Sequence, residues 1–534
     1  MRYILRDIKM PLDYAEADLR EKTRKMLGLG DIAAIGILKK SVDARDKSNI
    51  FFVLTLEIGS RERSRRVQPE PEKPEQNTPG IAQYPAYPFK DRPVIAGSGP
   101  AGIFCALTLC RAGGRPIILE RGPRLERRVK DVAAFWQTGL LNESSNVQFG
   151  EGGAGTFSDG KLTTGTHDPR NRLILEEFVR AGAPDEILYL SKPHIGTDKL
   201  RGVLTRLRGE IEALGGEYIF DAKLAGIAVS GGKARAALAE RAGGGCEIAT
   251  EHIVLAVGHS SRDTFEALRG LGVSMAPKPF AVGVRIEHRQ EWINAAQYGK
   301  FAACTALGAA DYKLSARLGS GRGVFTFCMC PGGVVAASAS ERGGVVTNGM
   351  SRHARSGENA NSAVLVSVAA EDFYRGNPLD GIYWQRELEE RAFGAGIKAG
   401  GRGYFAPAQK LGDFLAGKPT EGFSGGVNAV TPSYAPGVAG ADLGSVLPCF
   451  VADALKEGIM LLGKKMPGFA RPDAVMTAVE SRSSSPVRIC RDAGYRASVA
   501  GIYPCGEGAG YAGGIMSSAV DGMKCAEALL AQNE

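Results

Sequence analysis

The segment 91–122, DRPVIAGSGPAGIFCALTLCRAGGRPIILERG, constrains the fold of this chain more than any other. A short apolar strand at 94–96 runs into the glycine pattern G-x-G-x-x-G, an apolar helix follows, and a second strand at 116–119 ends at Glu120. In this order the elements predict a βαβ unit that binds a dinucleotide, with Glu120 accepting the ribose hydroxyls. The alternative is a tight turn in an unrelated α/β domain, because the glycine pattern alone is a weak signal in a glycine-rich chain.

Each glycine of this pattern has its own expected role. Gly97 allows the tight turn, Gly99 lets the backbone approach a pyrophosphate, and Gly102 lets the helix pack closely on the strand. The helix begins at Pro100 and Ala101, so its N-terminus offers N–H donors and a partial positive charge to the phosphates.

Composition limits the class of protein. A length of 534 residues predicts two or three domains, and the 44 % hydrophobic and 23 % charged residues are ordinary for a globular protein. The 71 glycines are about twice the usual share, as expected where backbone approaches a ligand closely. The net charge of +8 is modest for this length and does not by itself indicate nucleic-acid binding.

The cysteines and the first residues of the chain indicate the cellular compartment of the protein. The 10 cysteines are scattered without zinc-ligand spacing, so we expect a reducing environment, mostly buried thiols and no metal site. The first residues, MRYILRDIKM, lack the apolar core of a signal peptide. Because no apolar run approaches the ~18 residues of a membrane span, we expect a cytoplasmic protein.

The first 60 residues are expected to form a small domain of their own. Their apolar patterning predicts a strand, a helix and two further strands, at 2–8, 15–27, 32–42 and 50–58. Residues 61–91 are rich in proline and charge without periodicity, which is typical of a linker. After the βαβ unit, the glycine-rich loop FGEGGAGTFSDGK occupies 149–161, and short strands are expected over 217–258.

A second glycine-rich segment lies near the end of the chain, in GIYPCGEGAGYAGGIMSSAVDGMKCAEALL. A predicted strand leads into Gly506 and Glu507, and a helix of small residues begins at Ile515 after Gly513 and Gly514. This arrangement again aims a helix N-terminus at an anion or a polar ring edge, and Glu507 can accept hydrogen bonds from a sugar-alcohol chain. The alternative is a C-terminal docking helix after a hinge.

Together these motifs resemble known flavoproteins. The early fingerprint, a mid-chain strand ending at Gly258 and the C-terminal Gly506-Glu507 segment are similar to the glutathione-reductase-type FAD proteins. More narrowly, the strings FGEGGAGTFSDGKL, VGVRIEH, FCMCPGG, NGMS, SRSSSPVRI and YPCGEGAGYAGGI resemble the bacterial family of uncharacterised FAD-dependent dehydrogenases. This resemblance extends over essentially the whole chain.

The resemblance implies an α/β fold class: a discontinuous Rossmann-like FAD-binding domain with an inserted α+β substrate domain, plus the small N-terminal βαββ domain. On this basis the FAD-binding domain takes residues 92–161, 217–275 and 481–534. The inserted substrate or cap domain takes residues 162–216 and 276–480.

The resemblance also implies the cofactor contacts. The residues implied to hold FAD are Gly97, Gly99, Pro100, Ala101, Gly102, Glu120, Arg121, Arg128, Gly153, Thr156, Leu224, Gly258, Gly506, Glu507, Gly513, Gly514 and Ile515. Arg121 and Arg128 are phosphate or adenine-side contacts in this interpretation, with a solvated basic helix as the alternative. Leu224 meets the adenine through its backbone, Glu507 binds the ribityl chain, and the helix after Gly514 faces the pyrimidine edge of the flavin.

The catalytic residues are less explicit. Lys161, in the glycine loop, is a candidate for contact with flavin N5 or the substrate, and the alternative is a structural turn with a solvent-facing lysine. Cys328 and Cys330 share one face of a predicted strand and can act as a thiol pair, or they are small buried apolar residues. His288 is the preferred histidine for acid–base chemistry, against a purely structural role.

Two classes of function follow. The first is an FAD-dependent oxidoreductase that transfers hydride through flavin N5 to or from an unidentified small molecule. No second complete fingerprint is present, so NAD(P)H, if used, visits the flavin face transiently. The alternative is a flavin-dependent RNA-modifying or nucleic-acid-associated protein, motivated by the basic start of the linker at 61–66 and the small N-terminal domain. A scaffold or sensor with structural FAD is a third reading.

Overall fold

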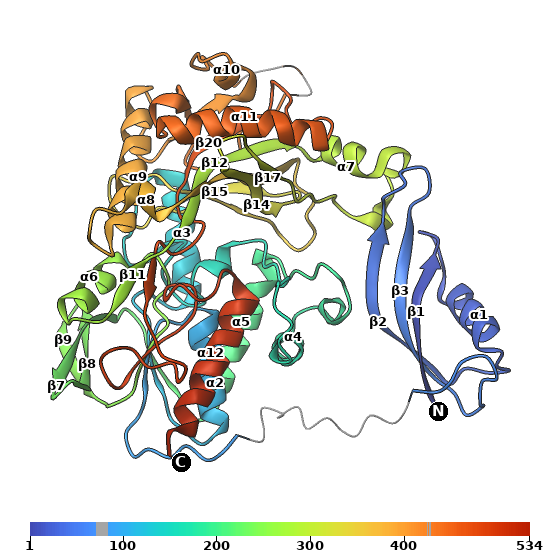
Figure 1. The fold of residues 1–534 in the computed structure, drawn as a ribbon, viewed down its shortest axis with the longest axis horizontal. Helices are drawn as coiled ribbons and strands as arrows, with labels where there is room; N and C mark the ends of the chain where they lie inside the picture. Colours follow the sequence, from blue (N-terminus) through green and yellow to red (C-terminus); the bar gives the residue numbers. More distant parts are fainter. Residues whose placement is uncertain (71–83, 424–425, 427–428, 534) are drawn as a thin grey trace.

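Figure 1 shows a small N-terminal unit beside a larger body that is built on two main sheets. The computed structural model describes residues 1–70, 84–423, 426 and 429–533. Part of the predicted linker, residues 71–83, therefore lies outside the described residues.

The N-terminal unit is a three-stranded antiparallel sheet with one helix, in the strand order β1-β3-β2. Its elements are β1 (Arg2–Met10), α1 (Glu16–Leu27), β2 (Ala34–Asp43) and β3 (Phe51–Gly59). Alternate residues of β3, among them Leu54 and Leu56, are buried in one core with Leu19 and Leu27 of α1. The predicted strand–helix–strand–strand order is confirmed.

A five-stranded parallel sheet forms the lower part of the body in Figure 1, in the order β22-β10-β4-β5-β6. Its strands are β4 (Val94–Ala96), β5 (Ile117–Leu119), β6 (Glu217–Ile219), β10 (Ile253–Leu255) and β22 (Ile502–Pro504). All but β6 are fully buried, as a parallel sheet covered on both faces requires. Three separate stretches of sequence thus build one sheet, with the fingerprint strand β4 at its centre.

Different layers cover the two faces of this sheet. One face packs against the helices α2 (Pro100–Arg111), α4 (Arg170–Arg180), α5 (Thr197–Ala213) and α12 (Ile515–Leu530). The other face packs against α6 (Arg262–Gly270) and a small antiparallel sheet of β7 (Lys223–Ser230), β8 (Lys233–Arg241) and β9 (Gly244–Ala249). The sequence assigned residues 162–216 to the inserted domain, whereas α4 and α5 share the core of the parallel sheet with α2.

The upper part of the body is a seven-stranded, mostly antiparallel sheet in the order β13-β14-β17-β12-β20-β18-β19. Its strands are β12 (Phe280–Arg289), β13 (Ser315–Arg317), β14 (Gly323–Cys330), β17 (Asn359–Val368), β18 (Ala406–Lys410), β19 (Val438–Gly440) and β20 (Val475–Glu480). Two short pairs accompany it, β11 (Met275–Pro277) with β21 (Val487–Ile489) and β15 (Val334–Ala337) with β16 (Thr347–Met350).

Helices cover the outer face of the upper sheet. They are α7 (Gln290–Tyr298), α8 (Ala370–Phe373), α9 (Asp380–Lys398), α10 (Leu411–Leu415) and α11 (Cys449–Lys465), while α3 (Leu125–Thr138) joins this core from the lower part. Leu455 and Ile459 of α11 are fully buried against Val282 and Val284 of β12. The inner face of the sheet is thereby left to face the parallel sheet.

The N-terminal unit contacts the body through the edge of β2. The Lys40 N–H donates to the Tyr189 carbonyl at 2.7 Å, and the Ser191 N–H donates to the Lys40 carbonyl at 3.0 Å. Within the described part of the chain, no helix combines the length and apolar character needed to cross a membrane.

Candidate functional site

A cavity of about 730 Å³ lies between the carboxyl ends of the parallel strands and the inner face of the upper sheet. Its volume is in the range of roughly 300–1,000 Å³ that is typical of ligand sites. Residues 97–101 of the fingerprint line one end, and residues 326–329 of β14 line the other. The cavity therefore joins the predicted dinucleotide site to the upper sheet.

The fingerprint glycines form the close contacts expected of them. Gly97 has φ of 107°, and a Cβ there would collide with the carbonyl oxygen of Ala256. A Cβ at Gly102 would collide with the carbonyl oxygen of Gly97, so Gly102 sets the close packing of α2 on β4. The first residues of α2 line the cavity, and no side chain caps its free N–H groups.

Glu120, at the end of β5, is buried in the wall of the cavity. One carboxylate oxygen accepts hydrogen bonds from the Ser98 N–H at 3.1 Å and the Ser98 hydroxyl at 2.6 Å. The other accepts from the N–H groups of Gly122 and Gly150, each at 3.0 Å. Glu120 thus fixes the two glycine turns to each other, and its contact with a ribose stays a prediction.

The two predicted arginines have different surroundings. Arg121 lines the cavity, with its guanidinium 4.2 Å from the centre of the Phe149 ring and 2.7 Å from Asp263 Oδ1. Arg128 does not line the cavity. It is completely buried and donates to the carbonyl oxygens of residues 146, 147 and 151 and to the Thr156 hydroxyl. It therefore holds the glycine loop in shape from within, which is neither the predicted phosphate contact nor a solvated face.

Arg128→Lys is expected to lower the free energy of unfolding by about 2 kcal/mol, since an ammonium cannot reach all the carbonyl groups that the guanidinium fork satisfies. The unfolding midpoint in urea and the ligand content of the purified protein measure this. Arg127→Lys is the matched control, because the Arg127 side chain is exposed and its ion pairs among the described residues are with Asp131 and Asp221. Equal unfolding midpoints for the two variants would contradict the role of Arg128 in holding the glycine loop.

The closing segment meets the fingerprint at the cavity. Residues 505–507 and 513–515 line it, and α12 begins at Ile515 with its N-terminus toward the opening. Burial raises the pKa of Glu507 to about 7, and Glu507 Oε1 lies 3.8 Å from His259 Nε2. Burial lowers the pKa of His259 to about 3, so this histidine is neutral near pH 7.

The structure brings together most of the predicted cofactor residues. Those that line the cavity are Gly97, Gly99, Pro100, Ala101, Glu120, Arg121, Gly153, Leu224, Gly258, Gly506, Glu507, Gly513, Gly514 and Ile515. Gly102, Arg128 and Thr156 lie behind this wall.

Lys161 lies at the far end of the cavity in a charged cluster. Its Nζ is 3.3 Å from Asp159 Oδ2 and donates to the Met329 carbonyl. Asp159 also accepts from Arg355 and Ser351. Burial works against the Asp159 charge, but Lys161 and Arg355 outweigh it and hold the pKa of this carboxyl well below its ordinary value. Asp159 and Arg355 were not singled out in the sequence.

His288 lies on the other face of the upper sheet. Val282, Val284 and Ile286 precede it at alternate positions of β12, and all are buried in the core beneath α11. His288 Nε2 is 2.7 Å from the Phe469 carbonyl, and burial lowers its pKa to about 4. The proposed acid–base role of His288 is therefore not supported by its position, and the apolar alternation before it is the sequence signal for a core residue.

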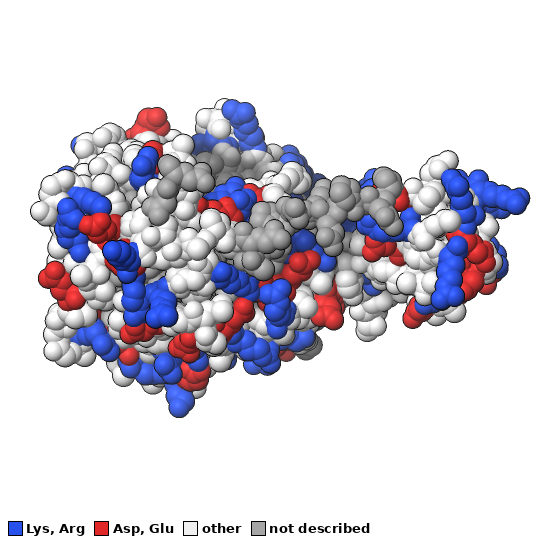
Figure 2. Space-filling model, turned by 90° about the horizontal axis from the view of Figure 1, so that it is seen from below, with Lys and Arg blue, Asp and Glu red and all other residues white. Residues whose placement is uncertain are grey.

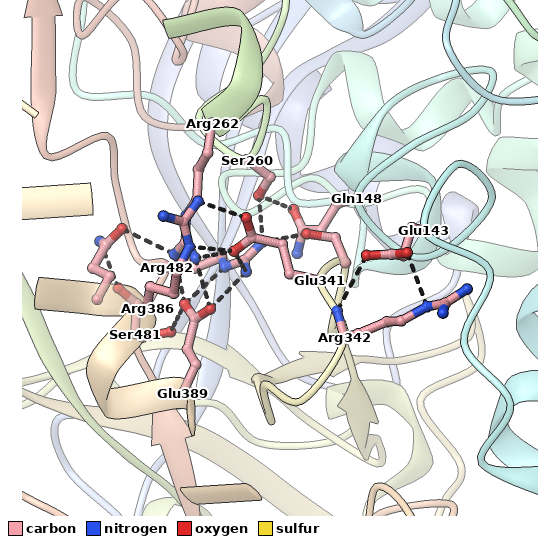
Figure 3. Close-up of polar contacts among 12 residues, drawn as sticks. Glu143, Gln148, Ser260, Arg262, Glu341, Arg342, Arg386, Glu389, Ser481 and Arg482 are labelled. Carbon is pink, nitrogen blue, oxygen red and sulfur yellow. Dashed lines mark hydrogen bonds and ion pairs between the residues drawn. The ribbon is translucent and has the colours of Figure 1, made fainter. Parts of the chain in front are cut away.

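A buried charge network adjoins the cavity, and Figure 3 shows Arg262 and Arg482 directed at Glu389. Arg482 also donates to the Ser260 hydroxyl at 3.1 Å, and both residues line the cavity. Glu389 lies on the buried stripe of α9 with Gln385 and Leu388, which is the only sequence signal for it. This network connects α6, α9 and the segment after β20.

Comparisons with known proteins identify the relatives of this chain. Residues 279–483 match the family described as "FAD-dependent protein, C-terminal domain-like", and residues 3–59 match a domain of unknown function (DUF8436). An uncharacterised protein of Clostridium beijerinckii is 46% identical over 539 residues, covering 98% of each chain.

Several solved structures are loosely similar. A geranylgeranyl bacteriochlorophyll reductase-like protein from Thermoplasma acidophilum is 12% identical over 82% of this chain and 77% of its own, with a TM-score of 0.35. Quinol fumarate reductase from E. coli is 11% identical over 83% and 70%, with a TM-score of 0.33. Glycine oxidase from Bacillus cereus is 11% identical over 83% and 96%, with a TM-score of 0.31. Likenesses this loose do not define an activity for this chain. The identity over nearly the full length of both chains shows that this chain belongs to the same family as the Clostridium beijerinckii protein.

Proposed function

We propose that this protein is an FAD-dependent oxidoreductase of the glutathione-reductase type, which transfers hydride to or from a small-molecule substrate. The observation that carries the proposal is that the N-termini of α2 and α12 open on one cavity, whose far end holds Lys161 and Cys328. The family match to an FAD-dependent domain supports it.

The residues of the cavity fit FAD. The start of α2 offers free N–H groups to a pyrophosphate, and at Gly99 the nearest protein atom to a Cβ position is 3.9 Å away, which supports room for a ligand there. Glu120 and Arg121 would hold the adenosine half, and Glu507 with the start of α12 would hold the flavin half. When bound, FAD supplies two-electron hydride chemistry.

The chain's own residues prepare the far end of the cavity. Burial works against the charge of Lys161, but Cys330, Cys328 and Asp159 outweigh it and raise its pKa, so Lys161 carries a fixed positive charge there. Glu507, with a pKa of about 7, can hold or release a proton at neutral pH. Lys192 and Lys313 also line the cavity; Lys192 pairs with Asp311 at 2.7 Å, and Lys313 adds a positive charge that favours an anionic substrate. The proposal includes NAD(P)H as a reductant of the flavin that binds only transiently.

The face shown in Figure 2 gives no support to the RNA-associated alternative. On the face shown in Figure 2, basic and acidic side chains are interspersed rather than gathered by sign. Nucleic-acid binding proteins usually concentrate Lys and Arg on one face.

The test begins with the cofactor. The purified protein is expected to be yellow and to release FAD, not FMN, on denaturation. Anaerobic titration with NADH and with NADPH, followed at the flavin absorbance, is expected to show bleaching by one of them. A protein that takes up no FAD when supplied with it would contradict the proposal.

A further inference from the structure

The far end of the cavity presents a thiol on a distorted strand. The pairing of β14 with β17 shifts between Phe327 and Cys330, so β14 holds one extra residue there. Cys328, in this bulge, has φ of 43°, in the left-handed region that a residue with a side chain rarely adopts. Cys328 lines the cavity, whereas Cys330 is fully buried behind it. Because of this bulge, Cys328 and Cys330 do not share one strand face, contrary to the sequence prediction.

A buried arginine holds this bulge. Arg285, on the inner face of β12, is fully buried and donates to the Cys328 carbonyl at 2.5 Å. The same nitrogen lies 3.5 Å from Cys330 Sγ, and another guanidinium nitrogen lies 3.2 Å from Glu480 Oε1. A Cβ at Gly349 would collide with this guanidinium, so the glycine makes room for it. The arginine fixes the backbone that carries the thiol.

The charged residues around the two thiols include one more cation than carboxylate. Among the described residues that contact each other around the two thiols, the cations are Lys161, Arg285 and Arg355, and the carboxylates are Asp159 and Glu480. Burial raises the pKa of Glu480 to about 7, so even the second carboxylate is only partly ionised near neutral pH. Arg285 is fully buried, and a partly ionised Glu480 only partly balances it, so a thiolate at Cys328 lowers the cost of burying this charge.

The two thiols divide this charge unequally. The proximity of Cys330, followed by the charges of Lys161 and Arg285, outweighs burial and holds the pKa of Cys328 well below its ordinary value. Proximity to Cys328, together with burial, raises the pKa of Cys330, whose Sγ donates to the Cys328 carbonyl at 3.3 Å. Across the cavity, Cys328 also contributes, after burial, to the raised pKa of Glu507. Cys328, which lines the cavity, is therefore the ionised member of the pair, and Cys330 stays protonated.

We propose that Cys328 is a thiolate nucleophile that undergoes exchange with small anionic disulfides in the cavity. The inference rests on the proposed function, because it takes this cavity as the place of the redox chemistry. The Cys328 sulfur attacks one sulfur of R–S–S–R, the S–S bond of the substrate breaks, and a Cys328–S–S–R bond forms. The released RS⁻ leaves the cavity as the thiolate or takes a proton from solvent. One disulfide is exchanged for another, so no external oxidant or reductant is needed.

Two observations favour this substrate class. The thiol that lines the cavity is Cys328, and a thiolate is the group that attacks a disulfide sulfur. Lys161, Lys313 and Arg355 also line the cavity and favour anionic groups on the substrate, whereas Lys192 already pairs with Asp311.

The test uses the flavin-loaded protein with Cys246→Ser and Cys449→Ser, which remove the exposed thiols. The probe is the dianionic disulfide dithiobis(nitrobenzoate), whose released thiol is coloured, and peptide mapping identifies the labelled cysteine. Between pH 9 and pH 6 the rate at Cys328 is expected to fall by less than about tenfold, whereas a thiol with an ordinary pKa falls on the order of two hundredfold. Lys161→Gln is expected to slow the reaction at pH 6 by about tenfold.

Two results would overturn the inference: Cys328 remaining unlabelled, or its rate falling with pH as that of Cys246 does in the unmodified chain. A neutral disulfide, hydroxyethyl disulfide, is expected to react more slowly than the dianionic probe, and the reverse order would remove the anionic preference. FAD content and NAD(P)H bleaching are measured on Cys328→Ser in parallel. If Cys328→Ser loses the labelling but retains flavin, the result tests this inference independently of the proposed function.

Discussion

Glu389→Gln is expected to lower the free energy of unfolding by about 3–5 kcal/mol, because it leaves two buried guanidinium groups without their main counter-charge. Arg262 donates to both carboxylate oxygens of Glu389, at 2.8 and 2.9 Å, and Arg482 donates to both at 2.9 and 2.7 Å. The Ser481 hydroxyl adds a further hydrogen bond at 2.7 Å. The carboxylate and both guanidinium groups are at most 3 % exposed, so water cannot replace these contacts.

The matched control for this change lies on the same helix. Glu387 is more than half exposed and pairs with Arg391 one turn away, so Glu387→Gln is expected to stay within about 0.5 kcal/mol of the parent. Urea or thermal unfolding midpoints compare the two variants. Indistinguishable midpoints would mean that Glu341, which also contacts Arg262, is sufficient to balance the arginines.

The interaction of Glu389 with the two arginines also predicts how the stability of the protein depends on pH. Burial opposes the charge of Glu389, but Arg262 and Arg482 outweigh it and hold its pKa well below the ordinary value. A carboxyl with a depressed pKa stabilises the fold fully above its unfolded pKa of about 4.3 and loses this contribution as pH falls. The stability difference between the parent and Glu389→Gln should therefore be constant near neutral pH and shrink below about pH 4.

The parts of the fold that the sequence predicts well are those with local causes. The βαβ fingerprint depends on residues within one segment, and strand, turn and helix form where Gly97, Gly99 and Gly102 indicate. The N-terminal unit follows from alternation along β3 and a helix with a clear apolar stripe. In both cases the pattern and the burial come from neighbouring residues in the chain.

The parts that the sequence does not predict depend on which surfaces meet. The apolar stripes of α4 and α5 predict helices but not that they pack on the parallel sheet. Arg262, Glu389 and Arg482 lie in distant segments, so their meeting is invisible in the sequence. His288 is a different case, because the alternation of Val282, Val284 and Ile286 along β12 is a local signal for a core position.

Gly99→Val is expected to give a folded protein whose affinity for FAD is lower by on the order of a hundredfold, because the new side chain would occupy the space of the pyrophosphate. The structure shows why folding should survive. Gly99 has φ of −73° and ψ of −178°, an extended conformation that valine adopts readily. The nearest protein atom to a Cβ there is Gly153 Cα at 3.9 Å, an ordinary contact. The side chain therefore fits the protein and competes only with the ligand.

The neighbouring glycines would not separate these effects. At Gly97 the φ of 107° and the collision with Ala256 would disturb the turn itself, so loss of FAD there would say nothing about the ligand. Gly209→Val is the matched control, because Gly209 is an exposed residue of α5 with nothing within 4 Å of its Cβ position. Flavin absorbance per chain, with circular dichroism to confirm folding, measures the result. Full flavin occupancy in Gly99→Val would show that the cofactor does not lie against the start of α2, and the orientation of FAD along the cavity would then have to be reversed or abandoned.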